Sequence, residues 1–389
     1  MIRAVALGVL GGVTLAADDH GPEGGHNPAR SQMHDLVTDP AAPPGSEAAG
    51  EAIEAASEAE LAAADSMRRF GVAEAPAKPA GAFRLATYNL ENLFDNVDDP
   101  KLSGKFEDID DAKPASEMVA EARAIRRLDA DVLCVEEVES KEALLAFRDT
   151  YLKGLGYDYV VSIDAGDERG IEQSVLSRFP VGEAHNWPQK PLGGVHPAKY
   201  GNSENWYAGQ AINFHRSPLM VDVTVPAGAR GNADPYTVTL VVVHHKSGRY
   251  SDYWREAEAK GAVELIDQAR SGDPDKRFVV LGDFNNEASS ESAKVYLRAG
   301  FTDAFAGRTG PEVVSHESGR RIDLILLGGK VKGEVVAGSA FVLGTPARPN
   351  GVDWRDLPTF PGYASDHYPV AVDIRVGDEG ESDGSGGHG

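Results

Sequence analysis

Short apolar runs that end in polar side chains recur along the middle of the chain. The plainest is Val279–Leu281, which stops at Gly282 and is followed by Asp283 and Asn285. Such a run predicts a buried strand whose end is directed at a site. Comparable runs end at Asn89, Glu137, His244 and the pair Asp366 and His367. The pattern therefore predicts five strand ends that converge on one cluster of oxygen and imidazole groups.

Between these runs the apolar spacing changes to three and four residues, which predicts helices. The best example is 115–129, where Met118, Ala122, Ile125 and Leu128 share one face. Further helices are expected at 140–153, 252–270 and 289–298. Strands are expected at 157–163, 174–177, 220–225, 237–244, 278–281, 322–327 and 370–374. This alternation of many strands with fewer helices predicts an α/β or α+β core with large sheets.

The two ends of the chain differ in composition from this middle part. Residues 18–80 are rich in Ala, Glu, Asp, Gly, Pro and Ser, which predicts a disordered linker. The tail 377–389 has no aliphatic or aromatic side chain and is expected to be disordered and acidic. A single large domain is therefore expected over 81–376.

Residues 1–17 carry one basic residue, Arg3, followed by an uninterrupted run of small and apolar residues. That order is typical of an export signal, and the run is too short to span a bilayer comfortably. We therefore expect a secreted or periplasmic protein. A wrongly assigned start or a buried N-terminal segment would also explain the run.

Charge narrows the choice of partners. Of the net charge of −23, residues 81–376 keep −12, because 1–80 carry 12 acidic and 5 basic residues and the tail carries 4 acidic ones. Such a domain repels polyanions, which argues against tight non-specific DNA binding without a divalent cation. A nuclease is not excluded, because a bound cation inverts the local sign of charge. Cys134 is the only cysteine, so neither an internal disulfide nor a cysteine zinc site is available.

The polar strand ends have the chemistry of a metal site. Mg²⁺ prefers oxygen ligands and keeps several waters, so one or two carboxylates and a carboxamide suffice. Glu137 is the first expected ligand, followed by Asn89 and Asp366. Asp283 and Asn285 would flank the attacking water or a second ion.

Two histidines can handle protons or stabilise charge in phosphoester hydrolysis, because imidazole titrates near neutral pH. These are His367 and His244, and each is expected to have a carboxylate on its other ring nitrogen. Asp323 is the expected partner of His367, and Glu172 that of His244.

Taken together, the core resembles the endonuclease/exonuclease/phosphatase superfamily, which includes the DNase I-like nucleases, bacterial sphingomyelinases and inositol-polyphosphate 5-phosphatases. The matching segments occur in the family's order and span nearly all of 83–374. They are Thr87–Asp95, Val135–Val138, Gly170–Glu172, Val243–Ser247, Gly282–Asn285, Arg321–Asp323 and Ser365–Val370.

The resemblance implies a four-layered sandwich, with two mixed β-sheets face to face and helices outside, and a site at one edge. It implies that Glu137 and Asn89 hold Mg²⁺, or else Mn²⁺ or Ca²⁺, and that Asp366 assists. It also implies that Asp283 and Asn285 position the water. His367 with Asp323 would act as base or charge stabiliser, and His244 with Glu172 would contact the scissile phosphate or the leaving group. Val243 departs from one branch, because the bacterial extracellular nucleases have asparagine there.

The function expected is that of an exported, Mg²⁺-dependent phosphodiester hydrolase acting on nucleic acid. The alternatives are hydrolysis of a lipid headgroup or small phosphate ester, and a non-catalytic module that binds cations or phosphate. No run carries the paired aromatics of an exposed apolar hairpin, which favours nucleic acid over lipid. The loops 186–210 and 345–363 contain aromatic and proline residues and would form either walls of the site or surface cover.

Overall fold

The computed structural model describes residues 65–97, 112–349, 360 and 362–376. The predicted export signal over 1–17, the linker over 18–64 and the acidic tail over 377–389 lie outside the described residues. Most of the loop 345–363 also lies outside them.

Two six-stranded mixed sheets form the centre of the molecule. The first has the order β15-β16-β1-β2-β4-β3, and its strands are Phe341–Val342, Val370–Arg375, Ala82–Leu93, Val132–Val138, Glu172–Ser177 and Tyr159–Ser162. The second has the order β13-β14-β12-β11-β10-β5, with Thr302–Asp303, Asp323–Gly328, Phe278–Asp283, Tyr236–His244, Leu219–Val225 and Val181–His185. In each sheet one central pair is parallel, β1 with β2 and β11 with β12.

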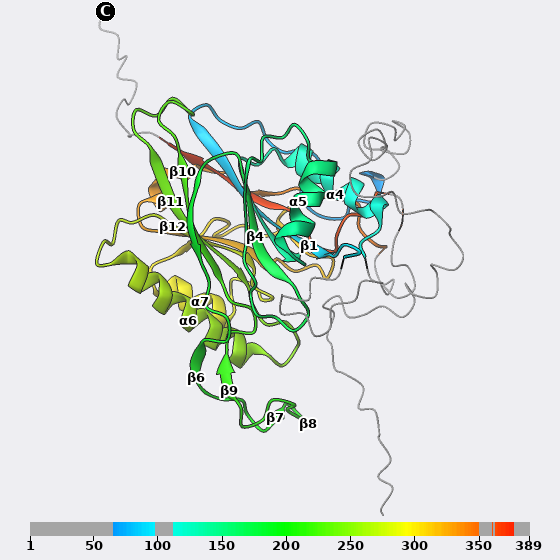
Figure 1. The fold of residues 1–389 in the computed structure, drawn as a ribbon, viewed down its shortest axis with the longest axis vertical. Helices are drawn as coiled ribbons and strands as arrows, with labels where there is room; N and C mark the ends of the chain where they lie inside the picture. Colours follow the sequence, from blue (N-terminus) through cyan, green and yellow to red (C-terminus); the bar gives the residue numbers. More distant parts are fainter. Residues whose placement is uncertain (1–64, 98–111, 350–359, 361, 377–389) are drawn as a thin grey trace, which may run out of the picture.

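Helices cover the outer faces of both sheets, which makes four layers (Figure 1). Helices α4 (Ala115–Leu128) and α5 (Lys141–Tyr151) pack on the first sheet. Helices α6 (Asp252–Arg270) and α7 (Glu291–Arg298) pack on the second. The short helix α8 (Val331–Glu334) follows β14, and a 3-10 turn, η2, covers Pro311–Val313. The expected four-layered sandwich of two mixed β-sheets is confirmed.

Each sheet is buried on both faces, so successive residues of a strand face alternately the other sheet and the helices. In β12, Val279 and Leu281 face the other sheet, whereas Phe278 and Val280 face α6 and α7. Gly282 continues this strand with a φ of 132°, and a Cβ there would lie 2.0 Å from the carbonyl oxygen of Val243. Glycine is therefore required where β12 approaches β11 most closely.

The disordered linker was predicted to extend to residue 80, but its last part is ordered. Residues 65–80 pack on the domain, and Phe70 contacts the core between the sheets and the ring of Tyr368 at 6.0 Å. The backbone N–H of Val72 also donates to the carbonyl of Val342 at 2.8 Å. This segment has only one aromatic residue, so its composition concealed a contact that a single side chain anchors.

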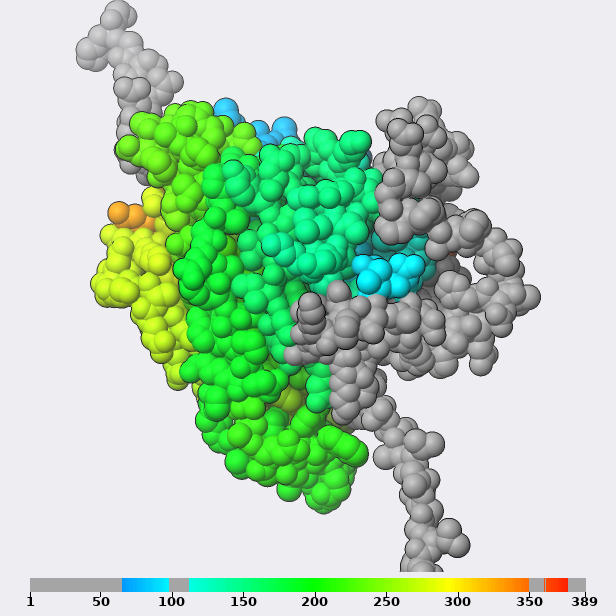
Figure 2. Space-filling model, viewed as in Figure 1, coloured from blue at the N-terminus to red at the C-terminus, as the bar shows by residue number. Residues whose placement is uncertain are grey.

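An arm, residues 191–213, projects beyond α6 (Figures 1 and 2). It contains β6 (Pro191–Val195) paired with β9 (Ala211–Asn213), and β7 (Lys199–Tyr200) paired with β8 (Ser203–Glu204). Its base is held by His196, whose ring lies 4.3 Å from that of Trp254 in α6. Trp206 is 80% exposed and Val195 61% exposed, so the arm presents one aromatic and one aliphatic side chain to solvent.

Within the part of the chain that the structure describes, no helix is long and apolar enough to cross a membrane.

Candidate active site

The site lies at one edge of the gap between the two sheets, and strand alternation brings most of its residues there. Residues two apart in a strand share a face, so a polar residue two positions from an apolar residue of the core between the sheets also faces inward. The pairs are Leu281 with Asp283, Val242 with His244, Ile325 with Asp323, and Leu85 with Asn89 by way of Thr87. All four polar residues are buried.

His367 and Asp323 form the predicted dyad. Nδ1 of His367 lies 2.9 Å from Oδ2 and 3.0 Å from Oδ1 of Asp323. Burial alone would lower the pKa of His367, but the charges of Asp323 and Asp283 outweigh it and hold that pKa well above its ordinary value. The carboxylate therefore orients the ring and favours its protonated form.

Asp283 and Asn285 form the next part of the site. Asp283 accepts the backbone N–H of Asn285 at 2.7 Å and its side-chain amide at 3.0 Å. Nε2 of His367 lies 3.8 Å from Oδ2 of Asp283. Burial raises the pKa of Asp283 to about 7, although the charge of His367 opposes this rise. A carboxylate in that range can accept a proton from water near neutral pH.

Glu137 lies at a β-bulge of β2, in the left-handed conformation with φ of 61°. It accepts the amide of Asn89 at 3.2 Å and the backbone N–H of Asn92 at 3.1 Å. Arg169 lies 3.5 Å from its Oε2. The predicted ligand Glu137 thus faces the site from a backbone geometry that departs from the regular alternation.

Asn89, the second predicted metal ligand, makes three contacts through its side-chain amide. Its oxygen accepts the backbone N–H of Glu91 at 2.9 Å, and its nitrogen lies 3.2 Å from Glu137 and 3.4 Å from Asp283. A backbone N–H can only donate and carboxylates accept, so these partners fix which amide atom is which. Asn89 therefore positions two carboxylates, and its amide oxygen keeps a second lone pair. Its role as a metal ligand stays a prediction.

The predicted pairing of His244 with Glu172 was wrong. Neither ring nitrogen of His244 has a hydrogen-bond partner among the described residues. Its Nε2 lies 3.5 Å from Asp283 and 3.7 Å from Glu137. Glu172 accepts instead from Ser162, on the face of β4 that it shares with Leu176, which packs toward α4 and α5. Burial, reinforced by nearby arginines, lowers the pKa of His244 well below its ordinary value.

Sequence reasoning missed the role of Glu91. Its carboxylate accepts the hydroxyl of Tyr363 at 2.6 Å and the backbone N–H of Asp366 at 3.1 Å, and Arg348 lies 3.3 Å away. Burial, followed by the charge of Asp366, raises the pKa of Glu91 to about 7. Glu91 thus holds the segment that carries Asp366, and its place two residues after Asn89 was the available signal.

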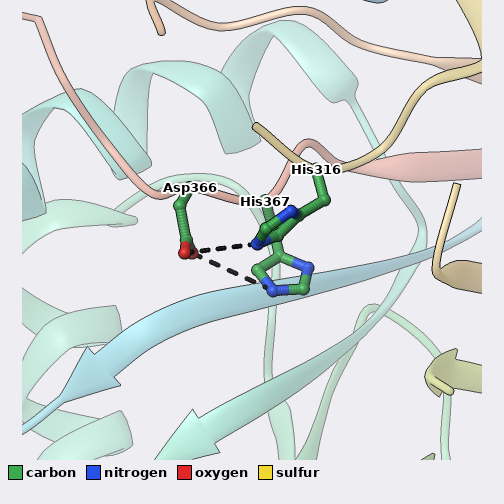
Figure 3. Close-up of side chains that lie close together, drawn as sticks. All are labelled: His316, Asp366 and His367. Carbon is green, nitrogen blue, oxygen red and sulfur yellow. Dashed lines mark ion pairs between the residues drawn. The ribbon is translucent and has the colours of Figure 1, made fainter. Parts of the chain in front are cut away.

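His316 was missed as well. Figure 3 shows that its ring and that of His367 both approach the carboxylate of Asp366. Nε2 of His316 lies 3.4 Å from Asp366 Oδ2, and Nε2 of His367 lies 3.9 Å from Oδ1. Burial would raise the pKa of Asp366, but the hydrogen bond and charge of His316 and the charge of His367 lower it. The predicted metal ligand Asp366 is thus placed beside two imidazoles.

A cavity of about 380 Å³ is lined by several of these groups, namely Glu91, Glu137, Asp283, Asn285, His316, Asp366 and His367. Its walls also contain three basic residues, of which Arg249 and Arg320 lie in loops and Arg255 lies in the first turns of α6. Arg255 is held by Asp252 at 2.7 Å. The cavity therefore combines carboxylates and imidazoles with guanidinium groups, which suits an anionic substrate attacked by water.

The donor set fits a divalent cation. Glu137 and Asp283 lie close together, bridged by the amide of Asn89, and the raised pKa of Asp283 shows that burial leaves its negative charge poorly compensated. A hard cation would supply that compensation. Glu137 and Asp283 would hold it, with Asp366 a third candidate, and the cation would stabilise charge on the phosphate oxygens.

Comparison with solved structures gives likenesses of low sequence identity. An endonuclease/exonuclease/phosphatase from Bacteroides vulgatus has 15% identity and a TM-score of 0.48, with 76% of this chain and 99% of that chain covered. The human Nocturnin catalytic domain with bound sulfate has 14% identity and a TM-score of 0.46, covering 80% and 98%. A mannosyl-6-phosphatase from Bacteroides thetaiotaomicron has 16% identity and a TM-score of 0.45, covering 75% and 98%.

No curated protein matches the sequence significantly. The model of the Endonuclease/Exonuclease/phosphatase family, however, matches residues 86–367, which is most of the chain and contains every residue of the predicted site. The chain therefore belongs to the endonuclease/exonuclease/phosphatase family, whose members hydrolyse phosphoester bonds and typically depend on a divalent metal.

Proposed function

We propose that the protein is an exported, Mg²⁺-dependent phosphodiesterase that cleaves nucleic acid by attack of water on phosphorus. The observation that carries this proposal is one cavity whose lining includes His367, Asp283 and the guanidinium groups of three arginines. Asp323 lies outside this lining and contacts Nδ1 of His367 at 2.9 Å. Carboxylates and imidazoles can orient and deprotonate the attacking water, and guanidinium groups can bind the phosphates of a polyanion.

Each group has a role in this reaction. Asp283, held by the backbone N–H and the side-chain amide of Asn285, accepts hydrogen from the attacking water. His367, oriented by Asp323, stabilises charge that develops on the phosphate oxygens. The clustering of these groups around one cavity supports a hydrolase over a module that only binds.

The position of the arm favours a polymeric substrate. In the turn between β7 and β8, Gly201 lies against the ring of Tyr250, where a Cβ would come 3.3 Å from the ring. Tyr250 in turn lies under Arg249, whose guanidinium carbon is 5.6 Å from the ring centroid. The arm thus adjoins the wall of the cavity, and its exposed Trp206 is available to stack on a base of a bound strand.

A second candidate substrate is a lipid headgroup. Trp206 and Val195 are exposed on the same arm, and such residues also suit the interface of a bilayer. The three arginines of the cavity and the adjoining Tyr250 favour nucleic acid, because they give a strand both charge and a stacking surface.

The experiment is hydrolysis by the purified full chain of plasmid DNA, single-stranded RNA, sphingomyelin vesicles and bis-p-nitrophenyl phosphate, each with Mg²⁺ or with EDTA. We expect EDTA-sensitive cleavage of a nucleic acid, with loss of several orders of magnitude in Asp283→Asn. Cleavage of the vesicles alone would transfer the proposal to the lipid. Activity of Asp283→Asn close to that of the wild type would refute the assignment of the cluster.

A further inference from the structure

His316 faces the cavity, yet none of the roles above involves it. It is only 7% exposed, and its ring centroid lies 4.6 Å from that of His367 (Figure 3). With Asp366 and His367 it forms a group whose ligand atoms all lie within 4.8 Å of one another. That arrangement has two chemical readings, a metal site or a hydrogen-bonding site for the phosphate.

The backbone holds His316 in register with the catalytic segment. The N–H of Tyr368 donates to the carbonyl of Ser315 at 2.7 Å, and the N–H of Glu317 donates to the carbonyl of Asp366 at 2.8 Å. These bonds form an antiparallel bridge between His316 and His367. His316 is therefore positioned by the same segment that carries Asp366 and His367.

The tautomer of His316 decides between the two readings. The backbone N–H of Ser318 donates to Nδ1 at 2.9 Å. The hydroxyl of Ser318 lies 2.8 Å from the same nitrogen, and it accepts from Nε of Arg320 at 3.1 Å, which leaves its own hydrogen for Nδ1. Because a backbone N–H can only donate, Nδ1 is an acceptor and the ring hydrogen of neutral His316 is on Nε2.

A histidine that binds a metal through Nε2 normally donates from Nδ1 to a second group. His367 has this arrangement, since its Nδ1 faces Asp323. His316 has the opposite one, because Ser318 occupies the lone pair of Nδ1 and the ring hydrogen is on Nε2, which lies 3.4 Å from Oδ2 of Asp366. The two neighbouring rings are therefore set up for different tasks, and His316 is a donor rather than a ligand.

We propose that His316 donates its Nε2–H to a non-bridging oxygen of the substrate phosphate and so stabilises the transition state. This proposal rests on the phosphoester hydrolysis proposed above. No proton is transferred and no bond forms in this role, because the hydrogen bond only strengthens as charge grows on the oxygen. Arg320 lines the same cavity and donates to the hydroxyl of Ser318. It therefore helps to hold the tautomer of His316 beside the place where the substrate would bind.

The test compares His316→Ala and His316→Gln with the wild-type full chain, because the glutamine amide retains a donor near the position of Nε2. We expect His316→Ala to lower kcat by about 10²–10³-fold at saturating Mg²⁺, the effect of removing one positioned donor. The Mg²⁺ concentration for half-maximal activity should not change, and His316→Gln should recover much of kcat. His185→Ala, which removes an exposed histidine of β5, is the control.

The second measurement is ¹⁵N NMR of the histidine side chains, which reports the tautomer directly. We expect hydrogen on Nε2 of His316, and a shift of this resonance when inorganic phosphate is added. Hydrogen on Nδ1 alone, a raised Mg²⁺ requirement with kcat retained, or an unchanged kcat in His316→Ala would overturn the proposal. If the wild type hydrolyses no phosphoester, the proposed function fails, and the phosphate titration still decides whether His316 binds the anion.

Discussion

Asp323 and His367 join the two sheets. Asp323 begins β14 of the second sheet, whereas His367 precedes β16 of the first, and Asp323 Oδ2 lies 2.9 Å from Nδ1 of His367. Ser315 donates to the same carboxylate oxygen at 2.6 Å. The orientation of the imidazole therefore depends on how the sheets pack and on one further hydroxyl.

Asp323→Asn should lower kcat strongly while the fold is retained. An asparagine can turn its amide N–H toward Nδ1, which would favour hydrogen on Nε2, and it removes the charge that most raises the pKa of His367. By analogy with other carboxylate–histidine pairs we expect a loss of about 10²–10⁴-fold in kcat at saturating Mg²⁺. Ser315→Ala keeps the carboxylate and serves as the control, with a loss of about tenfold or less. Equal losses in the two variants would mean that the charge of Asp323 is unimportant.

Glu137→Gln should change the metal requirement more than the chemistry. Glutamine retains the shape and one oxygen but removes the negative charge that attracts a divalent cation. We expect a higher Mg²⁺ concentration for half-maximal activity, and a smaller rise in Tm when Mg²⁺ is added, because ligand binding stabilises the folded state by mass action. Glu139→Gln is a matched control, since Glu139 is buried nearby and accepts the backbone N–H of Asp95. An unchanged Mg²⁺ dependence in Glu137→Gln would remove it from the set of ligands.

The sandwich could be predicted from sequence because its strands are buried on both faces and read as apolar runs. Strand β12 at Phe278–Asp283 and β11 at Tyr236–His244 lie close to their expected bounds. Strand β6 could not be predicted, because Pro191–Val195 is almost entirely solvent-facing and includes two glycines. Exposed pairing of this kind leaves no periodic pattern.

The sequence predicts the positions of site residues that depend on alternation along one strand. It does not predict those that depend on contacts between segments distant in the sequence. Asp283 lies two residues after the inner Leu281 and Asp323 lies two residues before the inner Ile325, so alternation along each strand predicts that both face inward. Alternation also places Glu172 and His244 on different faces, because Glu172 lies on the face of β4 that Leu176 directs toward the helices. The sequence therefore contained enough information to reject this pairing. The orientation of the Asn89 amide and the pairing of His316 with His367 depend on contacts between distant segments, which no local pattern encodes.

Glu136→Gln should stabilise the protein at neutral pH. Glu136 is fully buried beneath the site, where it accepts the hydroxyl of Thr87 at 2.7 Å, and burial raises its pKa well above the ordinary value. A raised folded-state pKa means that stability is lost as pH rises above the unfolded value of 4.5, by up to about 1.4 kcal/mol per pH unit for one proton. Glutamine does not titrate, so it removes this loss.

Urea unfolding in EDTA at several pH values measures this effect. The free energy of unfolding of Glu136→Gln should match that of the wild type near pH 4.5 and exceed it increasingly toward pH 8. A difference that is constant with pH would mean that Glu136 is not protonated in the folded state.

Trp206→Ala separates the reaction from the recognition of the substrate. The side chain is 80% exposed on the arm and lies outside the residues that line the cavity, so its removal should leave hydrolysis of bis-p-nitrophenyl phosphate unchanged. Base stacking on an exposed aromatic contributes about 1–3 kcal/mol per base, which corresponds to a loss of about 5–150-fold in kcat/KM on single-stranded nucleic acid. Trp206→Phe keeps an aromatic face and should retain most of the activity. If Trp206→Ala instead reduces only the cleavage of sphingomyelin vesicles, the arm binds lipid, and equal activity on every substrate would show that the arm takes no part in recognition.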